Sequence, residues 1–139
     1  MSFISGVKHV RQEEDYTCVA ACLRMALDYW SVQKSEQDIA VLTHTTVTGT
    51  RLEESIAVTA LGVEVMVDKA TLTDLQRYLD EGKPCIVSVL SIHFLHYALL
   101  PPVLHAVVVV GMDAENIHIF DPARESAPDV IPIKSFEAA

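Results

Sequence analysis

Apolar residues recur at helical spacing through the first half of the chain. Residues 18–30 carry one continuous apolar stripe, which predicts a helix packed on a core. The same spacing predicts three shorter helices, which begin at a serine or threonine suited to a helix cap. These helices are expected over residues 36–42, between Thr50 and Gly62, and between Thr71 and Gly82. The stripe of the first helix consists of Val19, Cys22, Leu23, Ala26, Leu27 and Trp30.

The period of the pattern changes after residue 84. β-Branched residues dominate residues 85–90 and 105–111, which predicts two strands with buried faces. Residues 113–116 are of types found in turns, so residues 117–120 are expected to return antiparallel to the strand before them. Weaker patterns predict strands at residues 63–67 and 130–133, and a terminal helix is expected to begin at Ser135.

Helices followed by antiparallel strands indicate an α+β fold. We expect the N-terminal helical half to pack on a C-terminal antiparallel β-sheet in two layers, with the reactive groups at their junction. The chain has 139 residues, half of them hydrophobic, which is enough to form the core of one domain. A single domain spanning residues 1–139 is therefore predicted.

Charge and cysteine content restrict the classes of protein to which this chain can belong. The formal net charge of −9 disfavours nucleic acid as a partner, because phosphate backbones are repelled. The chain lacks both a signal peptide and an apolar run of about 18 residues that would form a membrane segment. Three cysteines cannot all form disulfides, which favours a reducing compartment. We therefore expect a soluble cytoplasmic protein.

Cys18 is the strongest candidate for a reactive group. It lies where a charged stretch gives way to the first helix, and a helix N-terminus stabilises a thiolate and lowers its pKa. The alternative is a small buried residue of the core, since unpaired cysteine is among the most buried residue types. Three further residues in suitable positions favour the catalytic interpretation.

His105 and Asp121 are the candidate base and orienting acid. His105 begins the valine-rich strand and Asp121 follows the strand paired with it, so the hairpin is expected to bring them close. Histidines 9, 44, 93, 96 and 118 compete for the role of base, and an Asp-Pro turn is the ordinary alternative for Asp121. Gln12, six residues before Cys18, is the candidate donor to the oxyanion of the reaction intermediate.

A zinc site is the rival interpretation of the cysteines. Cys18, Cys22, Cys85 and a histidine could form a Cys3His centre. Zinc-binding cysteine pairs usually lie on a turn, whereas Cys22 lies on the apolar stripe of a helix. Cys22 and Cys85 are therefore interpreted as core residues, and we expect no metal and no cofactor.

The motifs around these residues resemble a known family. The chain has Gln12, then Cys18, then Ala-Cys-Leu-Arg-Met at residues 21–25, then His105 opening a valine run, then Phe120-Asp121-Pro122. This order resembles the papain-like cysteine peptidases of the bacteriocin-processing type, which include domains of peptide-exporting ABC transporters and stand-alone bacterial proteins. The transporter-linked members cleave leader peptides after a double glycine. The resemblance implies a hydrolase with Cys18 as nucleophile, His105 as base, Asp121 as orienting acid and Gln12 as oxyanion donor. It implies a peptide or protein as substrate.

Two departures from the family pattern leave other functions open. The family often has Asp-Cys-Gly at the nucleophile, where this chain has Thr17-Cys18-Val19, and relatives often continue further beyond Phe136, which implies a shortened chain. A catalytically silent peptide-binding module and an acyltransferase that uses the same thiol are the alternative functions. Apolar residues between Ser91 and Leu104 are expected to line a substrate groove or to form a buried loop.

Overall fold

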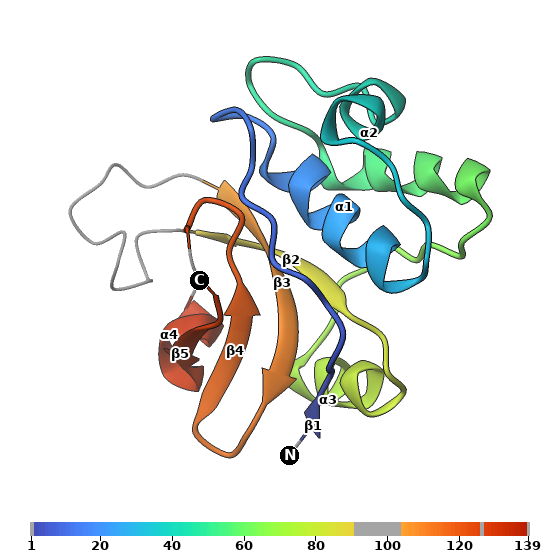
Figure 1. Cartoon of the computed structure of the whole chain (residues 1–139). Helices are drawn as coiled ribbons and strands as arrows, with labels where there is room; N and C mark the ends of the chain where they lie inside the picture. Colours follow the sequence, from blue (N-terminus) through green and yellow to red (C-terminus); the bar gives the residue numbers. More distant parts are fainter. Residues whose placement is uncertain (1, 91–103, 126, 139) are drawn as a thin grey trace.

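The computed structural model of the chain describes residues 2–90, 104–125 and 127–138 (Figure 1). Helices dominate the first half and strands the second, as the sequence predicts. In chain order the elements are β1 (Ser2–Phe3), α1 (Cys18–Tyr29), α2 (Glu36–Leu42), the 3-10 helix η1 (Leu52–Leu61), α3 (Leu72–Asp80), β2 (Cys85–Leu90), β3 (Leu104–Met112), β4 (Asn116–Phe120), β5 (Asp129–Pro132) and α4 (Ile133–Ala138).

The strands form one antiparallel sheet organised around β3. On one side of β3 lies β4, followed by β5, and on the other side β2 and β1 lie end to end. Val108 is paired with Ile86 of β2 and with Phe120 of β4, and the register of the β3–β4 ladder shifts between Val109 and Gly111. The predicted hairpin of residues 105–120 is therefore confirmed.

Helices cover both faces of this sheet (Figure 1). Ala106, Val108 and Val110 of β3 share a core with α1, α2 and η1, whereas Val107 and Val109 share a second core with α3 and α4. The α+β class is confirmed, but the expectation of two layers is wrong. The physical reason is that successive side chains of β3 point to opposite faces, and both sets are apolar and need cover.

Helix α1 is the central helix of the first core. Ala20, Ala21, Cys22 and Met25 are fully buried in it. The prediction that Trp30 belongs to the buried stripe is wrong, because the helix ends at Tyr29 and the side chain of Trp30 is 51% exposed. A residue beyond the last helical turn no longer follows the helical angle, so spacing alone does not predict its direction.

Two further segments differ from their predicted form. Residues 52–61 form a 3-10 helix rather than an α-helix, and it ends as expected at Gly62, whose φ of 91° suits glycine. Residues 63–67 were predicted as a strand, but among the described residues they form no ladder. Val63 and Val65 instead pack on the first core through their side chains, which accounts for the alternating pattern.

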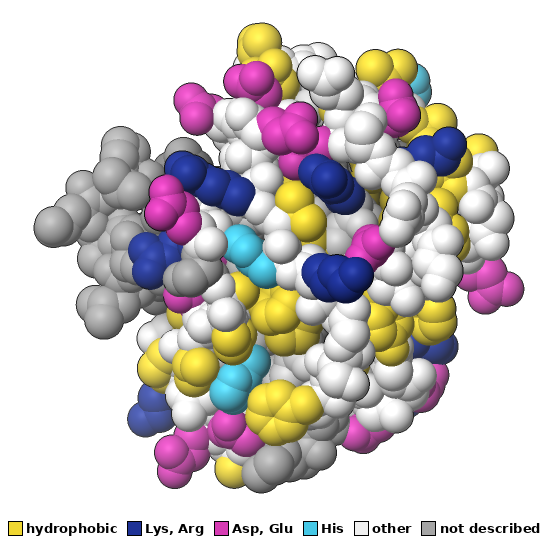
Figure 2. Space-filling model, in the orientation of Figure 1, with side chains coloured by type: hydrophobic (Ala, Val, Ile, Leu, Met, Phe, Trp, Pro, Cys, Tyr) yellow, Lys and Arg dark blue, Asp and Glu magenta, His cyan; other side chains and the backbone are white. Residues whose placement is uncertain are grey.

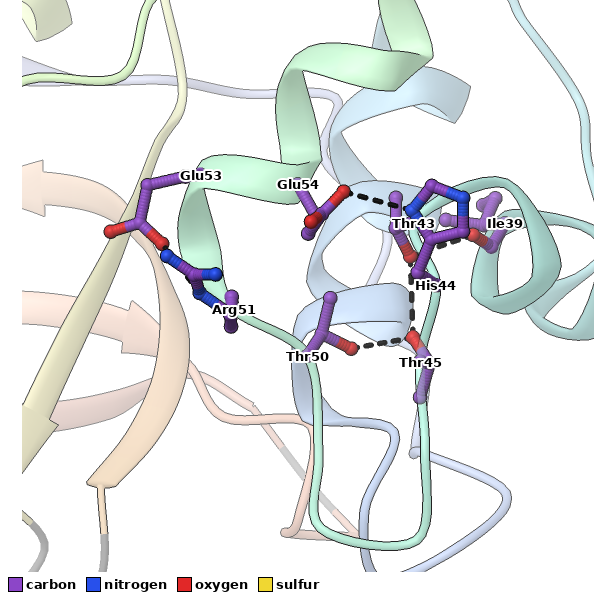
Figure 3. Close-up of polar contacts among 8 residues, drawn as sticks. All are labelled: Ile39, Thr43, His44, Thr45, Thr50, Arg51, Glu53 and Glu54. Atoms are coloured by element: carbon purple, nitrogen blue, oxygen red, sulfur yellow. Dashed lines mark hydrogen bonds and ion pairs between the residues drawn. The ribbon is translucent and has the colours of Figure 1, made fainter.

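The loop between α2 and η1 is held by its own polar side chains (Figure 3). The hydroxyl of Thr43 donates to the Ile39 carbonyl at 2.8 Å, and hydrogen bonds join Thr43 to Thr45 and Thr45 to Thr50. His44 Nδ1 lies 2.9 Å from Glu54 Oε2 of η1. These bonds satisfy polar groups of the loop and connect the two helices.

The start of α2 follows the predicted cap, since the Ser35 hydroxyl accepts a hydrogen bond from the Asp38 amide at 3.1 Å.

Across the described ranges, no helix has both the length and the apolar composition needed to cross a lipid bilayer.

Candidate active site

Cys18 is the first residue of α1. The preceding residue, Thr17, is buried, and its hydroxyl bonds to the backbone N–H and carbonyl of Glu14 instead of capping the helix. The first turn of α1 contains no acidic residue. No carboxylate within the first turn therefore neutralises the positive end of the helix dipole, which acts on the Cys18 thiol.

His105 and Asp121 lie in contact at the junction of β3 and the end of β4. His105 Nε2 is 2.6 Å from Asp121 Oδ1, the histidine is 8% exposed and the aspartate is fully buried. The β3–β4 register ends at Val108 and Phe120, so this bond lies just beyond the paired residues. The expectation that the hairpin brings residues 105 and 121 together agrees with this distance.

The Cys18 thiol is hydrogen-bonded to the His105 side chain, and this contact changes the pKa of both groups. Burial raises the pKa of Cys18, but hydrogen bonds from His105 and the Ala106 backbone, and the charge of His105, together hold it below its ordinary value. Burial lowers the pKa of His105, but the bonds to Asp121 and Cys18 raise it to about 9. A thiolate–imidazolium pair is therefore favoured at pH values between the two pKa values.

The other two cysteines have the opposite character. Cys22 is fully buried, and burial raises its pKa well above the ordinary value. Burial also raises the pKa of Cys85, to about 11. No group of three or more potential metal ligands occurs in the described part of the chain. Of the three thiols, Cys18 is the one whose surroundings favour the thiolate.

Gln12 lies beside the turn that follows Asp121, but its side chain has a local partner. The Gln12 backbone N–H donates to the Pro122 carbonyl at 2.7 Å, which joins the N-terminal segment to this turn. Its side-chain Nε2 donates to the Glu14 carbonyl at 2.7 Å, and its Oε1 is buried without a hydrogen-bond partner. In this structure the Gln12 amide group therefore stabilises the loop before Cys18. One of its two side-chain N–H groups donates to that loop.

Glu36 is a residue of this region that the sequence analysis missed. It is 1% exposed, and its Oε2 accepts a hydrogen bond from the Glu13 backbone N–H at 2.7 Å. Burial raises the pKa of this carboxyl group, opposed by its hydrogen bonds to Glu13 and Thr17. The first residue of α2 therefore anchors the loop that leads to Cys18. As Glu36 also fits the pattern of a helix N-terminus, its burial gave no separate signal in the sequence.

His9 is a second residue that the sequence analysis did not assign to the site. Its Nε2 donates to the backbone carbonyl of Asp121 at 2.7 Å, and its ring meets the Phe120 ring edge-on. His44 and His118 are paired with Glu54 and Asp113 instead. The remaining candidate histidines, 93 and 96, and the predicted apolar groove of residues 91–103 lie outside the described residues.

Solved structures share this fold over nearly the whole chain. A putative C39-like peptidase from Bacillus anthracis is 18% identical, with a TM-score of 0.82 and coverage of 99% of this chain and 90% of that one. The peptidase domain of Streptococcus ComA, a bifunctional ABC transporter involved in quorum sensing, is 25% identical, with a TM-score of 0.79 and coverage of 96% and 91%. A double glycine motif protease from an AMS/PCAT transporter, in complex with the leader peptide, is 21% identical, with a TM-score of 0.72 and coverage of 99% and 90%.

The class of fold is thus that of the papain-like C39 peptidases, as the resemblance implied. The sequence matches the Peptidase_C39 like family over residues 4–139, and the chain belongs to that family. An uncharacterized protein of Methanothermobacter marburgensis is 31% identical over 123 residues, which cover 88% of this chain and 76% of the relative.

Proposed function

We propose that this protein is a cysteine peptidase that hydrolyses an amide bond of a peptide or leader peptide. The observation that carries the proposal is the hydrogen-bonded series Cys18, His105 and Asp121, in which the thiol pKa is lowered and the imidazole pKa is raised. Cys18 is the nucleophile, His105 the general base and Asp121 the group that orients the imidazole.

The reaction follows from the protonation states of this series. The Cys18 thiolate attacks the carbonyl carbon of the substrate, and the tetrahedral intermediate carries the negative charge on oxygen. The His105 imidazolium donates its proton to the leaving amine, which leaves a thioester on Cys18. Neutral His105 then takes a proton from water, and the hydroxide formed attacks the thioester. This step releases the acid and the Cys18 thiolate, which restores the thiolate–imidazolium pair.

Val19 stands where the family often has glycine, but its side chain does not obstruct the proposed reaction. It is 6% exposed and belongs to the core beneath α1, while its backbone N–H is hydrogen-bonded to the Cys18 sulfur. The valine side chain is thus accommodated by the core, and its backbone amide helps to stabilise the thiolate.

A peptide is the substrate class that the relatives support. One similar structure is a double glycine motif protease in complex with the leader peptide, and another is the peptidase domain of a peptidase–transporter. The fold is shared with both, so a leader peptide is the first substrate to test.

The proposal is tested by trapping the acyl-enzyme. The protein is mixed with candidate peptides, quenched with acid and digested with trypsin, and the peptide of residues 12–24 is examined for an acyl group on Cys18. We expect the adduct on Cys18 and release of the peptide acid. Peptide binding without an adduct would instead support a silent binding module. Release of the acyl group only to an added amine would indicate an acyltransferase.

Gln12 is the proposed donor to the oxyanion, together with the Cys18 backbone N–H. Gln12→Ala should lower kcat about 10²–10³-fold with little change in KM, because the lost hydrogen bond strengthens only in the transition state. Steady-state kinetics would measure this, with Gln37→Ala in the exposed part of α2 as the control. If Gln12 merely supports the loop through the Glu14 carbonyl, the variant will lower Tm and leave kcat within a few fold.

A further inference from the structure

An open cavity of about 610 Å³ lies beside the candidate active site. Residues 8–10 form one wall, α1 forms the floor, and the loop of residues 33–35 forms the opposite wall. The charged residues that line it in the described part of the chain are Lys8, Arg24, Asp28 and Lys34. Three cations thus face one carboxylate, in a protein whose net charge is −9.

Two of these cations have no ionic partner among the described residues. Neither Lys8 nor Lys34 forms an ion pair within the described ranges, whereas Arg24 lies 3.7 Å from Glu13 at the edge of the cavity. Figure 2 shows several Lys and Arg side chains on this face, over α1 and the N-terminal segment, with Asp and Glu side chains between them. At physiological ionic strength the Debye length is about 8 Å, so acidic residues beyond that distance are largely screened. Glu13 at the edge of the cavity offsets Arg24, which leaves Lys8 and Lys34 as the unpaired cations of the lining within the described ranges.

The cavity is connected to the catalytic groups through the segment of residues 8–12. His9, which lines the cavity, donates to the Asp121 carbonyl at 2.7 Å, and the Gln12 N–H donates to the Pro122 carbonyl. Four residue steps separate Lys8 from Gln12, a span of at most about 14 Å. A bound peptide of a few residues beyond the scissile bond is long enough to reach the cavity.

We propose that this cavity binds a carboxylate-rich segment of the peptide substrate, at a distance from the bond that is cleaved. Lys8 and Lys34 pair with Asp or Glu side chains of the substrate, and Arg24 adds a planar donor suited to a carboxylate. The site selects acidic peptides although the protein as a whole repels them. The assignment of the ligand as a substrate rests on the proposed function.

The test measures binding separately from turnover. Fluorescein-labelled hexaglutamate and hexaglutamine peptides are titrated with the full-length protein, and fluorescence anisotropy is followed at low and physiological salt. We expect hexaglutamate to bind more tightly than hexaglutamine, and its affinity to fall as salt rises. The double variant K8E/K34E should weaken hexaglutamate binding about tenfold at low salt.

The matched control is K69E/K134E, which makes the same change in net charge at two lysines outside the cavity lining and without ion pairs in the described part of the chain. This control should bind hexaglutamate like the unmodified protein. Equal loss in both double variants, or equal affinity for the two peptides, would overturn the cavity as a specific site. In a protein that forms an acyl-enzyme, that result would leave the proposed function standing.

A kinetic measurement links the cavity to the substrate. For a cleaved peptide extended by six glutamates, K8E/K34E should raise KM with kcat unchanged, because the charges contact parts of the peptide that do not react. An unchanged KM, or tight hexaglutamate binding by a protein that forms no acyl-enzyme, would overturn the assignment of the ligand as a substrate.

Discussion

Replacement of Cys18 by alanine should abolish peptide hydrolysis, with a loss of about 10⁴–10⁶-fold in kcat, and should preserve peptide binding. The alanine removes the sulfur atom that is proposed to form the thioester, while the backbone amides and the cavity at residues 8–10 remain. Cys18 is partly exposed at the first position of α1, so the loss of one sulfur atom opens no large void in the core. Mass spectrometry of the products and isothermal titration of the same peptide would measure the two effects.

The control for this variant is Cys85→Ala. Cys85 begins β2, is partly buried and has a pKa raised to about 11, so its loss should leave kcat within about twofold. A Cys18→Ala protein that still cleaves the peptide would eliminate the proposed thiol chemistry. A variant that binds peptide and retains the full biological effect without turnover would identify the protein as a binding module.

Asp121→Asn should lower kcat by about 10²–10⁴-fold, because the neutral amide neither orients the His105 ring correctly nor stabilises its charged form. The variant should also change the pH dependence. The thiolate–imidazolium pair is lost above the pKa of His105, which Asp121 and Cys18 raise to about 9 against the effect of burial. Without the carboxylate this pKa falls toward its ordinary value of 6.5, so the alkaline limb of kcat/KM should move to lower pH.

The same contact predicts a pH-dependent difference in stability. A histidine whose pKa is raised by folding stabilises the folded state fully below its unfolded pKa of 6.5, and this contribution is lost as pH rises through about 9. The difference in Tm between the unmodified protein and Asp121→Asn should therefore be largest below pH 6.5 and shrink toward alkaline pH. Differential scanning calorimetry over this range would record it.

Asp113→Asn is the matched control for Asp121→Asn. It breaks another aspartate–histidine pair, in which Asp113 Oδ2 lies 3.0 Å from His118 Nε2 at the far end of the hairpin. Kinetics and the alkaline limb should be unchanged in this variant. If Asp121→Asn behaves in the same way, with kcat within tenfold and no movement of the limb, Asp121 does not orient His105 for catalysis.

Local sequence patterns were sufficient for the elements and for one contact of the site. Helical spacing predicted α1 and the position of Cys18 at its start, and two apolar runs around a turn predicted the hairpin that brings His105 to Asp121. The first inference rests on interactions between residues near in sequence. The second rests on two strands that pair across one turn. Such interactions leave a regular period in the chain.

The remaining features depended on packing between distant segments. Three features join elements whose relative positions follow from the shared core. They are the contact of Glu36 with residue 13, the contact of His9 with residue 121, and the cavity between Lys8 and Lys34. The sequence by itself determined the α+β class, the position of Cys18 at the start of α1 and the histidine–aspartate contact. Only the tertiary structure decided that helices cover both faces of the sheet, that the Gln12 backbone N–H bonds to the Pro122 carbonyl, and that Lys8 and Lys34 line one cavity. Contacts between residues far apart in the sequence leave no local period to read.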